Sequence, residues 1–318
     1  MTSNDDDTNH TAPAPTLSVG INPFGSPPDG ASWRSLLDQA AALEAVGVHR
    51  VVVPDHVVNG PDVASYPWGR FPTGPDGDWL EPLTVLTAVA AVTEHIRLGT
   101  GILVAPLRPA VLLAKQVATL DVLSDGRVDL GVGTGWQRHE LDAAGLDFDR
   151  RGQMLTDTLA ACRSLWSGGP SRVDTPTVTF DDVYCHPTPV QHRLPVWFSG
   201  TLHERNITRI VELGDGWIPI MGATHADLAD GTSLLRERLR DAGRDPHSLQ
   251  VRCSLTAARR DDGSFDLDAT LAPVPGLAAA GVTDLHLNSR AIDPTGEHLA
   301  ERCAELVRAL DAIARTQP

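Results

Sequence analysis

The chain has 318 residues, and its 26 basic against 41 acidic side chains give a net charge of −15 with histidine neutral. A hydrophobic content of 42% with 21% charged residues is typical of globular proteins and excludes a chain disordered throughout. The acidic excess repels phosphodiester backbones and anionic lipids, so we expect neither nucleic acid nor a membrane as a partner.

The first segment, residues 1–15, is polar and proline-rich and is predicted to be a disordered leader before a single domain over residues 16–318. It carries Asp5, Asp6 and Asp7 where a secretion signal would be positive, and no apolar run reaches the roughly 18 to 20 residues of a membrane-spanning helix. We therefore expect a cytoplasmic protein. The four cysteines are far apart and match no metal spacing, so no metal site is predicted.

From residue 17 onward, short β-branched runs alternate with segments of helical spacing. The predicted strands cover residues 17–21, 50–53, 97–104, 128–132, 196–199, 217–220, 250–255 and 284–288. The predicted helices run from a Ser32 N-cap through Val46, over 81–93, 109–123, 149–166, 203–213, 227–241 and 274–280, and from Leu299 to Ile313. An open doubly wound sheet is the alternative, but eight strand and helix pairs without a break in composition favour a (β/α)8 TIM barrel.

Two connecting segments are too long for simple loops. They give the barrel insertions after strand 2, from Asp55 to Leu80, and before strand 5, from Ser167 to Leu194. Long segments in a compact domain are usually functional or hold small elements of their own, and residues 177–180 are a candidate extra strand.

Ligands of such barrels gather at the carboxyl ends of the strands, which defines the candidate site residues. They are Asn22, Phe24, Asp55, His56, Pro106, Arg108, Thr134, Trp136, His139, Glu140, Gly200, Thr201 and Met221. His56 is the strongest candidate, because an imidazole at a strand end can exchange a proton near neutral pH. Asp55 is expected to fix its tautomer or the local backbone. The alternative is a histidine satisfied by loop carbonyls.

Three further features have two interpretations each. The glycine-rich run at residues 130–136 lacks the dinucleotide fingerprint, so its glycines either admit a ligand ring or allow tight strand-to-helix packing. The turn at Ser199, Gly200 and Thr201 precedes a helix and either receives a phosphate or is a plain N-cap. The third feature is a set of arginines that either meet an anionic cofactor tail or pair with nearby acids, Glu140 among them. These arginines are Arg70, Arg108, Arg138, Arg150 and Arg151.

Several motifs together resemble the luciferase-like flavin and deazaflavin superfamily. They are EPLTVL at residues 81–86, IRLGTGILVAP at 96–106, QVATLDVLSDGR at 116–127, LGVGTGW at 130–136 and GDGW at 214–217. The resemblance covers residues 17–220 and is strongest to F420-dependent oxidoreductases, whose members are (β/α)8 barrels.

The resemblance implies roles for individual residues. His56 matches a histidine near the deazaflavin ring, and Gly101-Ile102 matches the site where many F420-dependent members hold a non-prolyl cis peptide behind that ring. Ser199, Gly200 and Thr201 match a phosphate-binding turn, and His139 lies where members often contact the cofactor. The cofactor-binding set is therefore expected to be Asp55, Gly101, Ile102, Thr134, His139, Ser199, Gly200 and Thr201, with a substrate pocket formed by Phe24, Trp136 and Met221.

One departure concerns the substrate. F420-dependent glucose-6-phosphate dehydrogenases carry a glutamate where Trp136 stands and a tryptophan where Gly60 stands. A sugar phosphate is therefore not the expected substrate, and Trp136 instead suggests an aromatic surface against the ring or the substrate.

The predicted function is hydride transfer between coenzyme F420 and a small organic substrate. A monooxygenase that takes reduced FMN from a separate flavin reductase is the alternative within the superfamily, and a non-catalytic binding or assembly barrel is the alternative of another class. The helix at residues 83–92 is apolar nearly all round, and its outer face is expected to be covered in a homodimer, as in relatives.

Overall fold

The computed structural model describes residues 14–316. Of the predicted leader only residues 14 and 15 fall within this range, so that prediction lies outside the described residues. Among the described residues, no helix combines the length and the apolar character needed to cross a bilayer. The cytoplasmic location stays a prediction.

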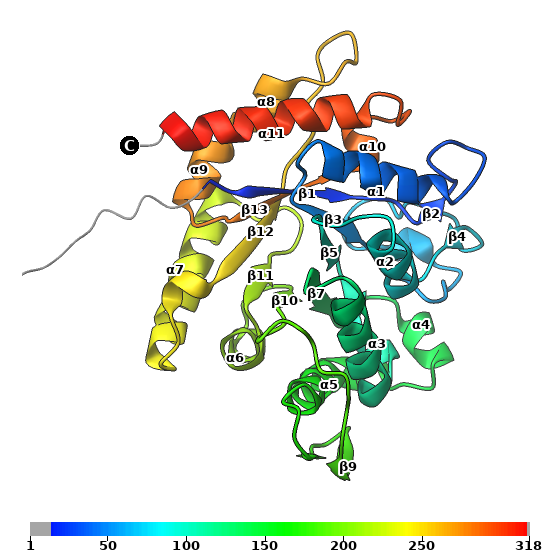
Figure 1. The fold of residues 1–318 in the computed structure, drawn as a ribbon, viewed down its shortest axis with the longest axis vertical. Coiled ribbons are helices and arrows are strands. Elements are labelled where there is room, and N and C mark those ends of the chain that lie inside the picture. Colours follow the sequence, from blue (N-terminus) through cyan, green and yellow to red (C-terminus); the bar gives the residue numbers. More distant parts are fainter. Residues whose placement is uncertain (1–13, 317–318) are drawn as a thin grey trace, which may run out of the picture.

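Eight parallel strands close into a barrel at the centre of the molecule (Figure 1). In sheet order they are β10 (Val196–Ser199), β11 (Gly216–Ile218), β12 (Gln250–Ser254), β13 (Asp284–Asn288), β1 (Thr16–Gly20), β3 (Arg50–Val53), β5 (Arg97–Thr100) and β7 (Val128–Gly133). The pairing of β10 with β7 closes the ring, which confirms the predicted TIM barrel and all eight strands. The last predicted part of the third strand, β6 (Leu103–Val104), is separated from β5 by Gly101 and Ile102 and pairs with β7.

Helices surround the barrel (Figure 1). Those that the sequence predicts are α1 (Ser35–Ala45), α2 (Pro82–Ala90), α3 (Ala110–Leu123), α5 (Arg151–Leu165), α6 (Glu204–Leu213), α7 (His225–Asp241), α9 (Val274–Ala279) and α11 (Leu299–Thr316). Short helices that the sequence did not predict are α4 (Arg138–Ala143), α8 (Leu267–Leu271) and α10 (Ser289–Ile292). Ser32 is not the N-cap of α1; it accepts a hydrogen bond from the Arg34 amide in the turn before the helix.

A buried ionic layer fills the barrel near the amino ends of the strands. Arg50 binds Asp129 and Asp284, and Arg252 also binds Asp284. Burial opposes the charge on Asp284, but the two guanidinium groups outweigh it and hold its pKa well below its usual range. The charged side chains at this end of the barrel are therefore paired with one another.

Both insertions hold small elements. The first contains the 3₁₀ turn η1 (Val63–Ser65) and β4 (Asp78–Trp79), which pairs with β2 (Phe24–Gly25) from the loop after β1. The second contains the hairpin of β8 (Ser171–Asp174) and β9 (Thr179–Val183), which projects from the body of the molecule (Figure 1). An extra strand is thus confirmed, although it begins two residues later than predicted.

Candidate functional site

All predicted site residues lie at the end of a barrel strand or after it, on one end of the barrel. Asp55 and His56 follow β3, Gly101 and Ile102 follow β5, and Thr134, Trp136 and His139 follow β7. Ser199 ends β10, with Gly200 and Thr201 directly after it, and Met221 follows β11. Because the strands are parallel, His56 and Thr201 share this carboxyl-end mouth, as predicted.

His56 is held by a buried carboxylate. Its Nδ1 lies 3.1 Å from Glu140 Oε2, and the indole N–H of Trp136 donates to Nε2 over 3.4 Å. An imidazole nitrogen that accepts carries no proton, so the neutral ring is protonated at Nδ1 and donates to Glu140. Nε2 carries the one free lone pair of the ring, so a proton can add there only when the Trp136 N–H moves away from it.

Glu140 is the contact of His56 that the sequence did not predict. It lies on α4, its side chain is inaccessible to solvent, and its Oε1 accepts a hydrogen bond from the Val57 amide over 2.6 Å. Of the two interpretations of the arginines, the one that pairs them with nearby acids does not hold for Glu140, whose carboxylate meets His56 and the Val57 amide. The available signal is its position in the stretch after the fourth strand, which makes it a candidate site residue.

Asp55 supports the backbone rather than the tautomer of His56. Its carboxylate binds the Arg108 guanidinium, with Oδ1 and Nη2 2.9 Å apart, and accepts from the Val104 amide over 2.8 Å. Burial raises the pKa of Asp55, and the hydrogen bonds from Arg108 oppose that rise. Of the two roles expected for Asp55, the structure thus shows the second.

Aromatic rings from three loops surround His56. This aromatic cluster consists of Phe24, Tyr66, Phe71, Trp79 and Trp136. The rings of Phe71 and Trp79 lie edge to face with the imidazole at centroid distances of 5.2 and 4.8 Å, and Trp136 lies at 6.2 Å. Phe24 joins the cluster by stacking on Trp79 at 4.5 Å. Three of the five rings come from the first insertion or its end, so the insertion forms one wall of the mouth.

The backbone between β5 and β6 reaches the mouth without a side-chain cover. The peptide bond Gly101-Ile102 is cis, as the resemblance implied. Gly101 is exposed and Ile102 is half-buried, whereas β5 before them is almost wholly buried. A Cβ on Gly133 would lie 2.8 Å from Ile102 Cδ1, so a larger residue in this part of the glycine-rich run would have to displace the end of the Ile102 side chain.

The turn after β10, a candidate phosphate-binding turn, has some of its hydrogen-bonding groups engaged within residues 14–316 and others free there. The Gly200 amide is not free, because it donates to the carbonyl of Ile218 over 3.0 Å. Asn206 holds the turn by donating to the carbonyls of Ser199 and Thr201. His203, not Thr201, is the N-cap of α6. Thr201 itself is exposed, so its hydroxyl and the amides that follow it are what this turn offers to an anion.

His139 packs against the first insertion. A Cβ on Gly60 would lie only 2.5 Å from the Cβ of His139, and Gln137 accepts a hydrogen bond from the Gly60 amide. A tryptophan at position 60 would therefore displace His139. This explains in physical terms why glycine stands here and not the tryptophan of the sugar-phosphate dehydrogenases.

The arginines near the mouth are mostly engaged. Arg108 is buried against Asp55 and Glu81, and Arg138 forms an exposed ion pair with Asp149 at 3.0 Å. Arg151 binds the carbonyls of Phe148 and Gly135. For these residues the structure supports pairing within the chain.

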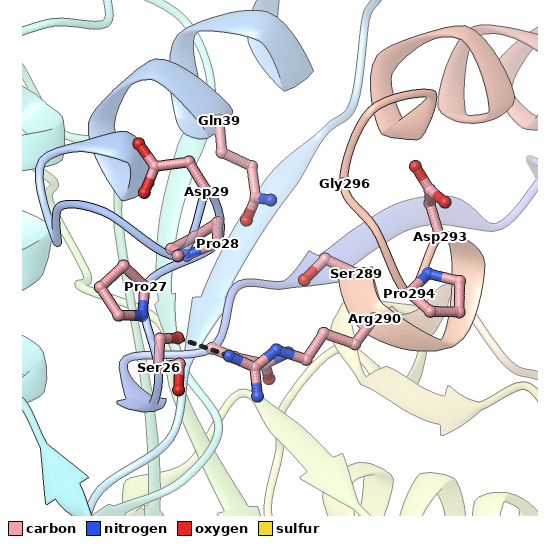
Figure 2. Close-up of a pocket in the computed structure, with 12 residues that line it drawn as sticks. Ser26, Pro27, Pro28, Asp29, Gln39, Ser289, Arg290, Asp293, Pro294 and Gly296 are labelled. Atoms are coloured by element: carbon pink, nitrogen blue, oxygen red, sulfur yellow. Dashed lines mark hydrogen bonds between the residues drawn. The ribbon is translucent and has the colours of Figure 1, made fainter.

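A hollow of about 500 Å³ lies between the loop after β1 and the segment after β13 (Figure 2). A second hollow, of about 510 Å³, adjoins it between α1 and the segment that leads into α11. Arg290 spans the first hollow and donates to the carbonyl of Ser26 over 2.6 Å. Its guanidinium also lies 5.8 Å from the ring of Phe24. The hollow therefore borders the mouth through Phe24. Met221, predicted for the pocket, is exposed after β11.

Neither metal-binding geometry nor cysteine pairing appears within residues 14–316. No three His, Cys, Asp or Glu side chains of that range are arranged to hold a metal ion, and the four cysteines are unpaired. Burial raises the pKa of Cys303 to about 12, so this thiol stays protonated at neutral pH.

The model of the luciferase-like monooxygenase family matches residues 14–308. An uncharacterised protein of Mycobacterium tuberculosis is 35% identical over 220 residues, which cover 67% of this chain and 77% of that relative. A phthiodiolone/phenolphthiodiolone dimycocerosates ketoreductase of the same species is 28% identical over 209 residues, which cover 63% of this chain and 54% of that relative.

Solved structures share the fold at lower identity. The F420-dependent tetrahydromethanopterin reductase of Methanopyrus kandleri has a TM-score of 0.72 at 16% identity and covers 93% of this chain and 99% of its own. An F420-dependent secondary alcohol dehydrogenase, solved with an F420-acetone adduct, reaches 0.75 at 18% with the same coverage. A long-chain alkane monooxygenase reaches 0.71 at 15%, covering 94% of this chain and 92% of its own.

Proposed function

The chain belongs to the luciferase-like monooxygenase family and is an oxidoreductase of that family, and from this premise we propose that it depends on coenzyme F420. In this proposal the protein transfers a hydride between F420 and a small organic substrate. His56 moves the proton that accompanies the hydride.

The observation that carries the proposal is the pair of His56 and Glu140. Glu140 engages Nδ1 of the imidazole, so proton exchange with a substrate is directed to Nε2 at the mouth of the barrel. A positioned acid or base of this kind contributes roughly 10² to 10⁴ in rate. Aromatic rings around the imidazole keep bulk water from it.

The residues of the mouth suit a flat ring with a phosphate tail. The ring would lie on the exposed backbone of Gly101 and Ile102, with Thr134 and His139 at the neighbouring strand end. The phosphate would meet Ser199, Gly200 and the exposed Thr201 before α6. The coenzyme, when bound, supplies or accepts the hydride, and the protein supplies orientation and control of the proton.

The activities named for relatives and for neighbours in fold support F420 dependence. Two neighbours in fold are F420-dependent, a reductase and a secondary alcohol dehydrogenase, and a curated relative is a ketoreductase. The alternative, an FMN-dependent monooxygenase that needs a flavin reductase as partner, is represented by the alkane monooxygenase in the fold comparison and by the family name.

Titration of the purified protein with F420 and with FMN, followed by quenching of tryptophan fluorescence, separates the two candidates. We expect saturable F420 binding and no comparable FMN binding. The variant His56→Ala should bind F420 as the wild type does and lose about 10²-fold in turnover. Tight FMN binding without F420 affinity would reverse the assignment.

We also propose that a second copy of this chain covers α2 and α3, which pack against each other. Large apolar side chains are exposed on or next to these helices at Val92, Val111, Leu112 and Leu123, and the outward residues of α2 itself, Thr84, Thr87 and Ala88, are small. Small residues allow two helices to approach closely. Light scattering should show a dimer that Leu112→Glu weakens, and a wild-type monomer at micromolar concentration would contradict the proposal.

A further inference from the structure

Trp79 is fixed in place by its neighbours on several sides. Its strand β4 pairs with β2, and the next amide, that of Leu80, donates to the carbonyl of Pro23 over 2.8 Å. The indole lies nearly parallel to Phe24 at 4.5 Å and to Phe71 at 5.6 Å. A side chain held in this way keeps one orientation, as residues that recognise a ligand must.

The indole of Trp79 meets the ring of His56 edge to face, with centroids 4.8 Å apart and planes at 84°. Its Nε1 is buried, and no acceptor is found for it among the described residues. A buried tryptophan N–H normally has a partner, so this one indicates an acceptor that the protein itself does not supply.

Other polar atoms near the mouth are also buried without a hydrogen-bond partner among the described residues. Asn59 Oδ1 and Thr73 Oγ1, on the same insertion, are buried without partners in the described structure, and so is Nε2 of Gln137, whose Oε1 accepts from the insertion at Gly60. Four of the nine such atoms in the described residues, that of Trp79 included, therefore lie where the insertion covers the mouth, and the other five, on Gln39, Trp197, Thr232, Arg236 and His286, lie elsewhere. The four at the mouth are the ones that a polar ligand bound there would complete.

We propose that Trp79 contacts the substrate and that its indole N–H donates a hydrogen bond to the oxygen of a hydroxyl or carbonyl group placed against His56. The inference rests on the proposed function and adds the substrate class: an alcohol and the corresponding ketone or aldehyde. The rings of Phe24, Phe71 and Trp136 nearby favour an apolar group on the reacting carbon.

The side chains of His56 and Trp79 have complementary roles in this reaction. The coenzyme, when bound, would accept the hydride released as the carbon–hydrogen bond breaks in oxidation. The hydroxyl proton passes to Nε2 of His56, from which the Trp136 N–H moves away, as the carbon–oxygen double bond forms. During reduction the same atoms move in reverse, with the proton coming from His56. Indole nitrogen only donates, so Trp79 holds the oxygen in both states and stabilises the negative charge that develops on it.

The test compares Trp79→Phe with Trp68→Phe in the full-length protein. The first keeps a ring between Phe24 and Phe71 and removes only the N–H; the second removes an N–H from an exposed tryptophan of the same insertion. The assay is reduction of a panel of ketones, from acetone to cyclohexanone, by reduced F420. We expect kcat/KM of Trp79→Phe to fall about 10²-fold. We expect F420 affinity to stay within about twofold in both variants, and Trp68→Phe to match the wild type.

A second readout does not depend on turnover. With ¹⁵N-labelled tryptophan, cyclohexanone added to the F420 complex should shift the indole N–H signal that is missing from Trp79→Phe and leave that of Trp68 unchanged. If Trp79→Phe does not fold, the wild-type titration still tests the contact, with Trp68→Phe identifying the control signal.

The outcomes separate the two proposals. A wild type that reduces ketones, with Trp79→Phe equally active or no indole signal shifted, overturns the role of Trp79. A wild type that binds F420 and reduces none of the ketones overturns the substrate class and leaves F420 dependence intact. A wild type that does not bind F420 overturns the proposed function itself.

Discussion

Replacing Glu140 by glutamine changes one oxygen of a buried carboxylate into an amide nitrogen. In the wild type, Oε2 faces Nδ1 of His56 at 3.1 Å and Oε1 accepts from the Val57 amide at 2.6 Å, so both neighbours are donors. A glutamine has one acceptor and one donor end. Whichever way it turns, it presents an N–H to one of these donors.

The result is the loss of one contact or a change of tautomer. If the amide nitrogen faces His56, the imidazole must carry its proton on Nε2, where it opposes the indole N–H of Trp136 and can no longer accept a proton from substrate. A hydrogen bond to a charged group is worth about 1.5–3 kcal/mol, which corresponds to a rate loss of roughly 10- to 150-fold. F420 binding should change little, because Glu140 is buried behind His56.

Single-turnover hydride transfer, followed by the absorbance of the deazaflavin, measures this loss. Glu301→Gln is the matched control, since Glu301 pairs with His298 at 3.5 Å on the exposed surface. Glu140→Gln in a His56→Ala background should cost nothing further, because Glu140 acts through His56. The ¹⁵N shifts of the His56 ring should report the Nδ1–H tautomer in the wild type.

A rate for Glu140→Gln within twofold of the wild type would refute this reasoning. So would an equal further loss in the His56→Ala background, since Glu140 would then act by another route. A wild-type imidazole protonated at Nε2 would contradict the assumption that the neutral His56 ring carries its proton on Nδ1.

Two further predictions concern stability. Burial and the nearby Arg252 lower the pKa of His286 to about 4, so between pH 6.5 and 4 the unfolded chain binds a proton that the folded chain does not. The free energy of unfolding should therefore fall by at most about 3 kcal/mol as the pH drops through this window. His286→Gln should abolish that part of the pH dependence, measured by urea unfolding. A slope unchanged by the substitution would contradict it. A Cβ on Gly131 would lie 2.2 Å from the carbonyl oxygen of Thr100, so Gly131→Ala should lower the free energy of unfolding by about 1–3 kcal/mol or more, whereas Gly169→Ala, with open space around it, should stay within about 0.5 kcal/mol. Equal effects of the two alanines in thermal unfolding would refute the packing argument.

The fold was predictable because its signals are local and repeated. Four consecutive buried residues in β3 read as a strand on their own, and the strand-and-helix alternation left few architectures. The elements that were missed are short: α4, α8 and α10 have at most six residues, too few for periodicity to register. Ser32 was misassigned because its hydroxyl satisfies a turn amide just before the helix, a use that favours the same residue type as an N-cap.

The site was predictable only where position after a strand determines it. His56 and Thr201 follow from the polarity of a parallel barrel. The partner of His56 does not, because Asp55, adjacent in sequence, points to Arg108, and Glu140, distant in sequence, reaches the imidazole. Trp79 was unpredictable for a similar reason, since only the pairing of β4 with β2 brings the far end of the insertion back to the mouth.

The hydrogen bonds of the mouth also divide it into two parts with different tasks. The loops after β3, β5 and β7 are tied to one another: Asp55 binds the Val104 amide, Gln137 binds the Gly60 amide, and Glu140 binds the Val57 amide. By contrast, Thr201 and Met221, after β10 and β11, are exposed. Proton transfer needs groups fixed to within about 0.5 Å, whereas a coenzyme tail needs an open path of entry. The linked loops therefore suit the reacting atoms, and the exposed loops suit the part of the coenzyme that enters and leaves.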